Sequence, residues 1–285
     1  MKILITGYNG MLGSDLVETL KNENKHDLIL TDVEELDITN FDEVIKVFKN
    51  EKPEIVINVA AYTDVDGCET NQDLAYNVNS IGPKNLAIAS NEINAKLLHI
   101  STDYVFSGEE SKPYKEEDGI GPKSYYGKTK LQGELFIKEN MEEYFIIRTA
   151  WLYGFNGKNF VKTMLELSKN NNKITVVNDQ YGSPTFAKDL SKSISEIIKT
   201  DKYGVYHVTN SDSCTWYEFA KQIFELANID VNVIPVTTKE YPTPAERPKY
   251  SVLSNEKWEN NGFKKLRSYK DALKSYIELE LENSE

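Results

Sequence analysis

Tyr126 and Lys130 lie one turn apart on a predicted helix and have the side-chain types needed for proton transfer. Residues four apart share a helix face, whereas Lys128, two residues from the tyrosine, points away. A tyrosine hydroxyl has an unperturbed pKa near ~10, so it exchanges protons poorly at neutral pH. A nearby ammonium stabilises the phenolate and lowers that pKa. The pair therefore predicts a tyrosine acid–base group that is tuned by Lys130.

Two hydroxyl side chains, Ser101 and Thr102, directly follow an apolar run that ends at Ile100. In a doubly wound sheet the carboxyl ends of the strands face the ligand crevice. A hydroxyl at that edge can donate a hydrogen bond to a carbonyl oxygen as charge develops on it. Strand alternation places the two hydroxyls on opposite faces, so the residues alone leave both as candidates.

A glycine-rich turn predicts a dinucleotide site. Gly7, Gly10 and Gly13 follow a predicted strand and open a predicted helix. Glycine permits the tight turn and the close approach of a pyrophosphate, which the helix amides then face. Asp32 closes the second strand, where a carboxylate would bind the adenosine ribose and repel a 2′-phosphate. With no Lys or Arg from Thr31 to Phe41, charge alone favours NADH, with NADPH tolerated.

Strand-like and helix-like segments alternate through the first half of the chain and must position these groups. The predicted strands span 2–7, 27–32, 54–61, 96–101 and 144–150. The predicted helices span 11–21, 41–50, 72–93 with an interruption at Gly82–Pro83, and 126–139. This alternation predicts βαβ units, and hence an α/β fold with a Rossmann-type doubly wound parallel sheet.

The alternation loosens after about residue 150. Predicted strands follow at 173–177, 205–208 and 231–236, and predicted helices at 187–198, 216–227 and 269–281. We expect residues 1–150 to form the NAD(P)-binding domain. Residues 151–285 are expected to form mainly a smaller α/β substrate-binding domain, with some segments returning to the Rossmann core.

Composition excludes several classes of function. The 285 residues carry a net charge of −12, so nucleic acid is not an expected partner. No apolar run approaches the ~18 residues of a membrane span, and the two cysteines form neither a disulfide framework nor a metal motif. These features predict a soluble cytoplasmic protein. The three histidines fit no catalytic cluster, and His99, within a strand, is expected to be packed.

Taken together, these motifs resemble the extended short-chain dehydrogenase/reductase pattern and, within it, the dTDP-4-dehydrorhamnose reductase family. The similar segments are 101–106, 126–130, 148–153, 179–185 and 247–251, and the resemblance covers nearly the whole chain. It implies NADH- or NADPH-dependent reduction of the C4 ketone of dTDP-4-dehydro-6-deoxy-L-mannose to dTDP-L-rhamnose. It also implies a small-molecule dTDP-sugar substrate and a role in polysaccharide biosynthesis.

The resemblance assigns roles by position. Thr102 would polarise the ketone oxygen, Tyr126 would donate the proton, and Lys130 would tune Tyr126 and hold the nicotinamide ribose. The other positions expected to line or brace the dinucleotide are Gly7, Gly10, Met11, Leu12, Gly13, Asp32, Asp37, Ile38, Ala60, Ala61, Tyr62, Asn79 and Ile100. The positions expected to contact the sugar nucleotide are Thr102, Asp103, Trp151, Gln180, Tyr181 and Arg247.

The resemblance also bears on metal binding, because some members of this family form dimers around Mg²⁺ held by acidic residues. Asp15 matches one of those positions, but Lys188 stands where a second acid is expected. A lysine cannot ligate Mg²⁺, which takes oxygen donors. We therefore expect no metal site in this chain, and a monomer or weak homodimer.

Two alternatives use the same scaffold. The first is another nucleotide-sugar enzyme, an epimerase or a dehydratase. A dehydratase adds an acid pair beside the active-site threonine, whereas here Tyr104 follows Asp103; an epimerase keeps NAD bound without net turnover. The second is a non-catalytic dinucleotide-binding regulatory subunit, similar to that of methionine adenosyltransferase. The presence of Thr102, Tyr126 and Lys130 together argues against it, because a binding module needs none of the three for chemistry.

Overall fold

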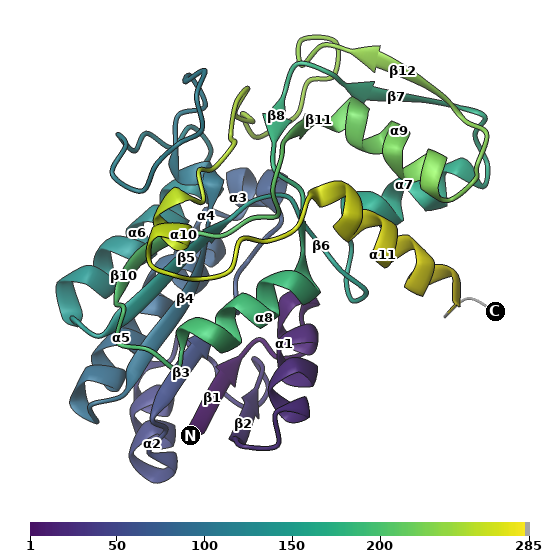
Figure 1. The fold of residues 1–285 in the computed structure, drawn as a ribbon. Coiled ribbons are helices and arrows are strands. Elements are labelled where there is room, and N and C mark those ends of the chain that lie inside the picture. The colour runs from purple at the N-terminus through teal and green to yellow at the C-terminus, as the bar shows by residue number, and fades with distance from the viewer. Residues whose placement is uncertain (283–285) are drawn as a thin grey trace.

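The central element of the computed structural model, which describes residues 1–282, is a six-stranded sheet (Figure 1). Its strand order is β10-β5-β4-β3-β1-β2, and every pairing is parallel. The strands are β1 (Lys2–Thr6), β2 (Asp27–Thr31), β3 (Ile55–Asn58), β4 (Lys96–Thr102), β5 (Tyr144–Thr149) and β10 (Gly204–His207). The expected α/β class with a doubly wound parallel sheet is confirmed.

Helices cover both faces of this sheet, which explains why its strands are apolar on both sides. Helices α1 (Met11–Asn22) and α8 (Ala187–Ile197) pack together on one face. The other face carries α2 (Phe41–Glu51), α5 (Gly82–Glu92) and α6 (Tyr125–Asn140). Alternate residues of β1 enter different cores: Ile3 and Ile5 pack with α1 and α8, whereas Leu4 packs with α2 and α5.

The long helical segment that begins at residue 72 is not broken at Gly82–Pro83. It consists of α4 (Gln72–Tyr76), a π-helical turn η1 (Asn77–Ile81) and then α5, which accommodates Pro83 in its first turn. Proline is tolerated there because its missing N–H has no partner in a first turn. The irregularity is thus the wide turn before the proline, and that turn carries Asn79.

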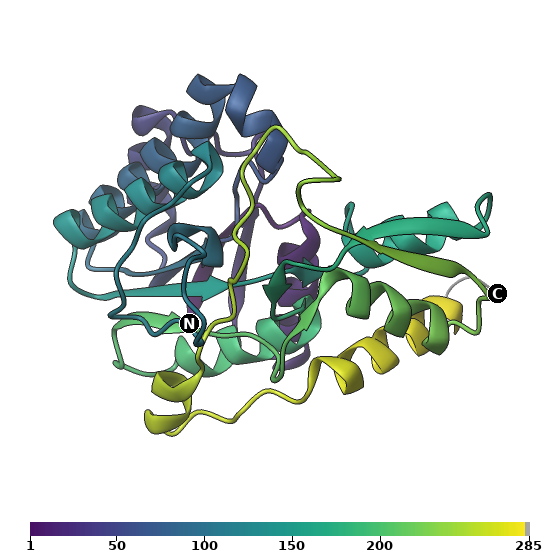
Figure 2. The same ribbon diagram turned by 90° about the horizontal axis from the view of Figure 1, so that it is seen from above.

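The remaining elements form a second core beside the sheet (Figure 2). It packs α7 (Phe160–Ser168), α9 (Trp216–Leu226) and α11 (Tyr269–Glu282) against the parallel pair β7 (Lys173–Val177) and β12 (Asn232–Val236). Two small pairs complete this part: β6 (Leu152–Tyr153) with β9 (Thr185–Phe186), and β8 (Tyr181–Gly182) with β11 (Cys214–Thr215). These pairs, like α3 (Val65–Thr70) and α10 (Glu256–Asn260), are too short to be read from periodicity.

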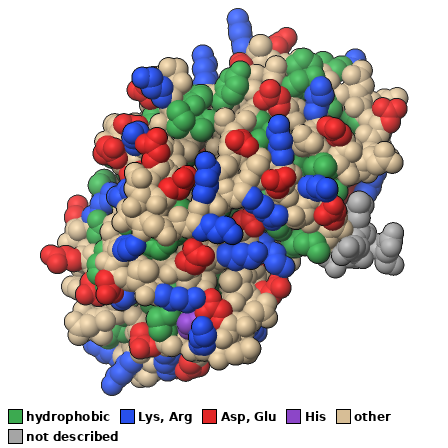
Figure 3. All heavy atoms as spheres, viewed as in Figure 1, with side chains coloured by type: hydrophobic (Ala, Val, Ile, Leu, Met, Phe, Trp, Pro, Cys, Tyr) green, Lys and Arg blue, Asp and Glu red, His purple; other side chains and the backbone are tan. Residues whose placement is uncertain are grey.

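Two elements that follow β9 in the sequence, α8 and β10, lie against or in the six-stranded sheet and not in this second core. Helix α8 packs on α1, and β10 extends the sheet edge beside β5. Among residues 1–282 no helix is long and apolar enough to cross a membrane. On the face shown in Figure 3, acidic and basic side chains are interspersed.

Candidate active site

The turn between β1 and α1 requires glycine for two different reasons. Gly7 has a φ of +77°, and a Cβ there would lie 2.8 Å from the backbone of Ala60, in the loop after β3. A Cβ on Gly13 would lie 2.2 Å from the carbonyl oxygen of Gly7, so this glycine lets the helix start against the strand. Gly10 caps α1 with extended backbone, which leaves the first amides of the helix open to an anion.

A cavity of about 310 Å³ opens beside this turn. Eight of the positions expected to line a dinucleotide form its wall: Gly7, Gly10, Asp32, Asp37, Ile38, Ala60, Ala61 and Tyr62. Asn79 does not reach the cavity; its amide instead binds both backbone groups of Tyr62, at 2.9 and 3.0 Å, and so fixes the wall from behind. Leu36, Thr39, Val59 and Val78 also line this cavity, although no sequence pattern indicated them.

A second cavity of about 460 Å³ lies at the carboxyl ends of β4 and β5. It shares Val59 and Ala61 with the first cavity, so the two cavities lie side by side. The expected reaction residues meet here, together with several expected cofactor and substrate positions: Met11, Leu12, Ile100, Thr102, Asp103, Tyr126, Lys130, Trp151 and Arg247. The tyrosine–lysine pair and the glycine turn thus line two adjoining cavities.

The structure separates the two hydroxyls that the sequence left open. Ser101 donates a 2.6 Å hydrogen bond to the buried carboxylate of Glu134. Thr102 donates to Asp103 Oδ1 at 2.9 Å, accepts from the Tyr104 amide at 3.2 Å, and forms a hydrogen bond with Tyr126. Only Thr102 therefore has its hydroxyl placed beside the tyrosine.

The tyrosine and the lysine experience opposite effects of burial. Burial raises the pKa of Tyr126, the charge of Asp103 adds to this, and the hydrogen bond with Thr102 opposes it. Burial lowers the pKa of Lys130 to about 8. The lysine ammonium donates to the Ile100 carbonyl at 2.7 Å, while Lys128 is exposed. Tyr126 is therefore held as a neutral phenol, the form that can donate a proton. The expected lowering of the Tyr126 pKa was wrong, because burial and the charge of Asp103 raise it instead.

Asp103 is a buried carboxyl at the same edge. Only 2% of its surface is exposed, and burial raises its pKa to about 6 against the hydrogen bonds that it accepts. Because the Thr102 hydroxyl donates its proton to Asp103, this carboxyl fixes the direction in which the hydroxyl and its lone pairs point.

Trp151 forms a wall of the cleft in an unusual backbone conformation. Its φ is +46°, and its indole stacks on Trp216 with the ring centroids 3.4 Å apart and the planes within 6°. A Cβ on Gly182 would lie 2.3 Å from the Trp151 ring, so glycine is required there. Trp216, at the start of α9, also lines the cleft, although no sequence pattern indicated it.

The other expected substrate residues divide between two places. Arg247 lines both the cleft and a neighbouring cavity of about 770 Å³, where Tyr181 also lies. Both Nη atoms of Arg247 bind the Asp66 carboxylate at 2.9 Å, a partner that the sequence did not suggest. Gln180 lines neither cavity: it is 5% exposed and donates to Thr238 Oγ1 at 3.0 Å.

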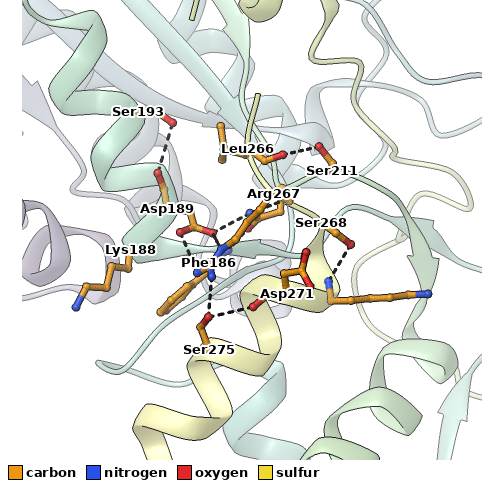
Figure 4. Close-up of polar contacts among 12 residues, drawn as sticks. Phe186, Lys188, Asp189, Ser193, Ser211, Leu266, Arg267, Ser268, Asp271 and Ser275 are labelled. Carbon is orange, nitrogen blue, oxygen red and sulfur yellow. Dashed lines mark hydrogen bonds and ion pairs between the residues drawn. The ribbon is translucent and has the colours of Figure 1, made fainter. Parts of the chain in front are cut away.

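The acidic positions considered for Mg²⁺ do not fit that ion. Burial raises the pKa of Asp15 to about 6, and the charge of Lys188 opposes this; Lys188 also lies 3.5 Å from Glu18. Figure 4 shows Asp189 directed at Arg267, which binds it at 2.8 and 3.1 Å. Mg²⁺ requires oxygen ligands, whereas Glu18 and Asp189 each already have a cation in contact, and the charge of Lys188 acts on Asp15. Among the residues that the structure describes, no group of three His, Cys, Asp or Glu could hold a metal.

Fold and site together define a Rossmann-type protein of the short-chain dehydrogenase/reductase class, with its tyrosine–lysine pair at the carboxyl edge of the sheet. The chain belongs to the RmlD substrate binding domain family, which it matches over residues 1–281. The resemblance stated from the sequence is thereby confirmed.

Solved structures and a curated relative agree with this assignment. A dTDP-4-dehydrorhamnose reductase from Clostridium acetobutylicum is 51% identical, with a TM-score of 0.96 over 98% of this chain and 99% of that one. The Bacillus anthracis enzyme of the same name, in complex with NADP, is 47% identical, with a TM-score of 0.95 over 97% and 98% of the two chains. The spore coat polysaccharide biosynthesis protein SpsK of Bacillus subtilis is 42% identical and covers 97% of both chains.

Proposed function

We propose that this protein is an NAD(P)H-dependent reductase that converts the C4 ketone of dTDP-4-dehydro-6-deoxy-L-mannose to the alcohol of dTDP-L-rhamnose. One observation carries the proposal: Thr102, Tyr126 and Lys130 line a single cleft that adjoins the cavity at the glycine turn and shares Val59 and Ala61 with it. The names of the relatives supply the substrate, and the cleft supplies the groups that a carbonyl reduction needs.

The chemistry divides between the cofactor and the chain. A bound reduced nicotinamide supplies the hydride. Tyr126 supplies the proton to the carbonyl oxygen, and its high pKa keeps that proton in place until charge develops there. Thr102 orients the same oxygen through its hydroxyl. Lys130 stabilises the phenolate left on Tyr126 and offers a remaining N–H to a ribose hydroxyl.

We propose that the sugar nucleotide occupies the far side of the cleft. The stacked Trp151 and Trp216 offer an apolar wall for a deoxysugar ring. Arg247 stands between the cleft and the 770 Å³ cavity, where it can contact a diphosphate although Asp66 neutralises part of its charge. On this proposal residues 1–150, with α8 and β10, bind the dinucleotide, and most of the remaining chain binds the sugar nucleotide. We also propose a monomer or weak homodimer, whose sedimentation Mg²⁺ would leave unchanged.

The direct test follows the loss of reduced-nicotinamide absorbance with dTDP-4-dehydro-6-deoxy-L-mannose, generated in place by an epimerase. We expect stoichiometric oxidation, and a drop of about 10²–10⁴-fold in kcat for Tyr126→Phe with dinucleotide affinity kept. Tyr125→Phe is the matched control, because Tyr125 lines neither cavity. Nearly full turnover in Tyr126→Phe would exclude the proposed proton donor. A bound dinucleotide without oxidation would instead favour an epimerase or a regulatory subunit.

Cofactor choice depends on Asp32, which lines the cavity at the end of β2. Its charge favours NADH, although the Bacillus anthracis relative was solved with NADP. Because removing the carboxylate removes its repulsion of a 2′-phosphate, we expect Asp32→Ala to shift the NADPH-to-NADH affinity ratio about tenfold towards NADPH. Titrations of both dinucleotides measure the ratio, with the exposed Asp27→Ala at the other end of β2 as control. An unchanged ratio would contradict a ribose-binding role for Asp32.

A further inference from the structure

A buried histidine beside Lys130 has no role in the proposed reaction. His99 is fully buried on β4, with its Nε2 3.3 Å from Lys130 Nζ and its Nδ1 3.0 Å from Asn58 Nδ2. The lysine, the imidazole and the asparagine thus form a row that leads from the cleft into the sheet. What Lys130 faces depends on which imidazole nitrogen carries the proton.

The orientation of the Asn58 amide is fixed by its other contacts. Asn58 Oδ1 accepts a hydrogen bond from the Thr6 hydroxyl at 2.7 Å and from the Ala60 amide at 3.1 Å. The Ala60 N–H can only donate, so a flipped Asn58 amide would turn an NH₂ group towards a donor. Asn58 must therefore present its NH₂ group to His99.

The tautomer of His99 follows from this orientation. Nδ1 faces a donor and must accept, so the single proton of the neutral imidazole lies on Nε2. Burial and the charge of Lys130 hold the pKa of His99 well below its usual value, which excludes the imidazolium form. The Nε2–H group therefore points at Lys130 Nζ. An ammonium there has no lone pair to accept this proton, whereas a neutral amine has one.

We propose that His99, fixed as its Nε2–H tautomer by Asn58, is a positioning residue that favours the neutral amine of Lys130 and so lowers the pH at which the reductase loses activity on its alkaline side. This inference rests on the reductase function proposed above, in which the ammonium is the active form. Sequence pattern alone treats His99 as a packed strand residue.

Other groups around Lys130 do not replace this effect. Glu134, one turn further along α6, favours the ammonium, but it is already bound by Arg148 at 2.7 and 2.9 Å. Tyr126 is neutral in the resting protein, and the Ile100 carbonyl accepts from either form of the amine. His99 is thus the neighbour whose single proton distinguishes the two forms.

The first test reads the tautomer directly and needs no turnover. ¹⁵N NMR of protein labelled at its three histidines separates a bare ring nitrogen from a protonated one. We expect His99 to show a bare Nδ1 and a protonated Nε2 at every pH between about 6 and 9. His99→Gln and His26→Gln assign the signals. A protonated Nδ1 with a bare Nε2 would overturn the inference, whatever the enzyme reduces.

The second test reverses the tautomer. In Asn58→Asp the carboxylate keeps the contacts to Thr6 and Ala60 and turns an acceptor towards Nδ1. The proton then moves to Nδ1, and the bare Nε2 accepts from the Lys130 ammonium. We expect the alkaline limb of the kcat/KM profile to rise by about one pH unit. His99→Gln, whose Oε1 can accept from Lys130, should shift it in the same direction, and His26→Gln should leave it in place.

The tautomer seen by ¹⁵N NMR and the alkaline limb of the kcat/KM profile must change together. If the carboxyl introduced by Asn58→Asp itself takes a proton and keeps the Nε2–H tautomer, the alkaline limb must stay where it is in the parent protein. A limb that moves without the tautomer, or a tautomer that changes without the limb, would exclude His99 as the cause. If the protein oxidises neither NADH nor NADPH, the same comparison is made on the pH dependence of dinucleotide binding, so failure of the proposed function remains distinguishable.

Discussion

Helix α6 carries two buried charged groups one turn apart, and their surroundings differ sharply. Glu134 accepts hydrogen bonds from Arg148 at 2.7 and 2.9 Å and from Ser101 at 2.6 Å. Among the residues that the structure describes, Lys130 contacts one carbonyl and one imidazole and no carboxylate. Glu134, Arg148 and Ser101, which we call the arginine cluster, satisfy the Glu134 charge inside the protein. Lys130 lines the cleft and has N–H groups left for further hydrogen bonds, as expected of a group that binds a ligand.

The largest expected effect breaks the arginine cluster. Arg148→Leu removes both guanidinium hydrogen bonds from the buried Glu134 carboxylate and leaves it only the part-exposed Lys138 ammonium, 3.7 Å away, which costs about 3–5 kcal/mol of folding free energy. Urea unfolding measures the loss. The double variant Arg148→Leu/Glu134→Leu should recover much of it, because no uncompensated charge remains. A single variant as stable as the parent would mean that Glu134 takes up a proton or reaches water, and the comparison would fail.

Lys130→Met tests the other half of the comparison. Removing an under-paired buried cation should leave the free energy of unfolding unchanged or higher, since methionine fills similar space without a desolvation cost. Turnover should nevertheless fall by about 10²-fold or more, because the Tyr126 phenolate loses its counter-charge. The same unfolding and absorbance assays measure both effects. A loss of stability equal to that of Arg148→Leu would place Lys130 among the structural charges.

The reactive residues and the glycine turn were predictable from their spacing in the sequence, whereas the residues that pack around them were not. Tyr126 and Lys130 share one helix, and the glycine turn joins adjacent elements, so local periodicity places both. Trp216 and Asp66 reach the site only through the packing of segments far apart in sequence. His99 is buried, as expected, but its role depends on the orientation of an amide on the neighbouring strand.

Gln180 was expected to contact the substrate but does not line either cavity, which the sequence could not predict. It belongs to a motif that resembles substrate contacts, yet the structure turns its amide onto Thr238, and the neighbouring Tyr181 lines the cavity instead. Adjacent residues in extended backbone point to opposite sides, so one residue of register decides which side chain can meet a ligand. Motif resemblance does not contain that information.

The smallest expected effects separate two adjacent hydroxyls. Both residues line the cleft, but the Ser101 hydroxyl binds Glu134 of the arginine cluster, whereas the Thr102 hydroxyl lies beside Tyr126. Ser101→Ala should lower the free energy of unfolding by about 1.5–3 kcal/mol, the value of a hydrogen bond to a charged group, and leave kcat unchanged. Thr102→Val should keep the fold and reduce kcat, since it removes the hydroxyl beside Tyr126. Urea unfolding and steady-state rates on both variants decide the matter. If Ser101→Ala slowed turnover as much as Thr102→Val, the arginine cluster would have to act on the reacting carbonyl, and the division between a structural and a reactive face of β4 would be wrong.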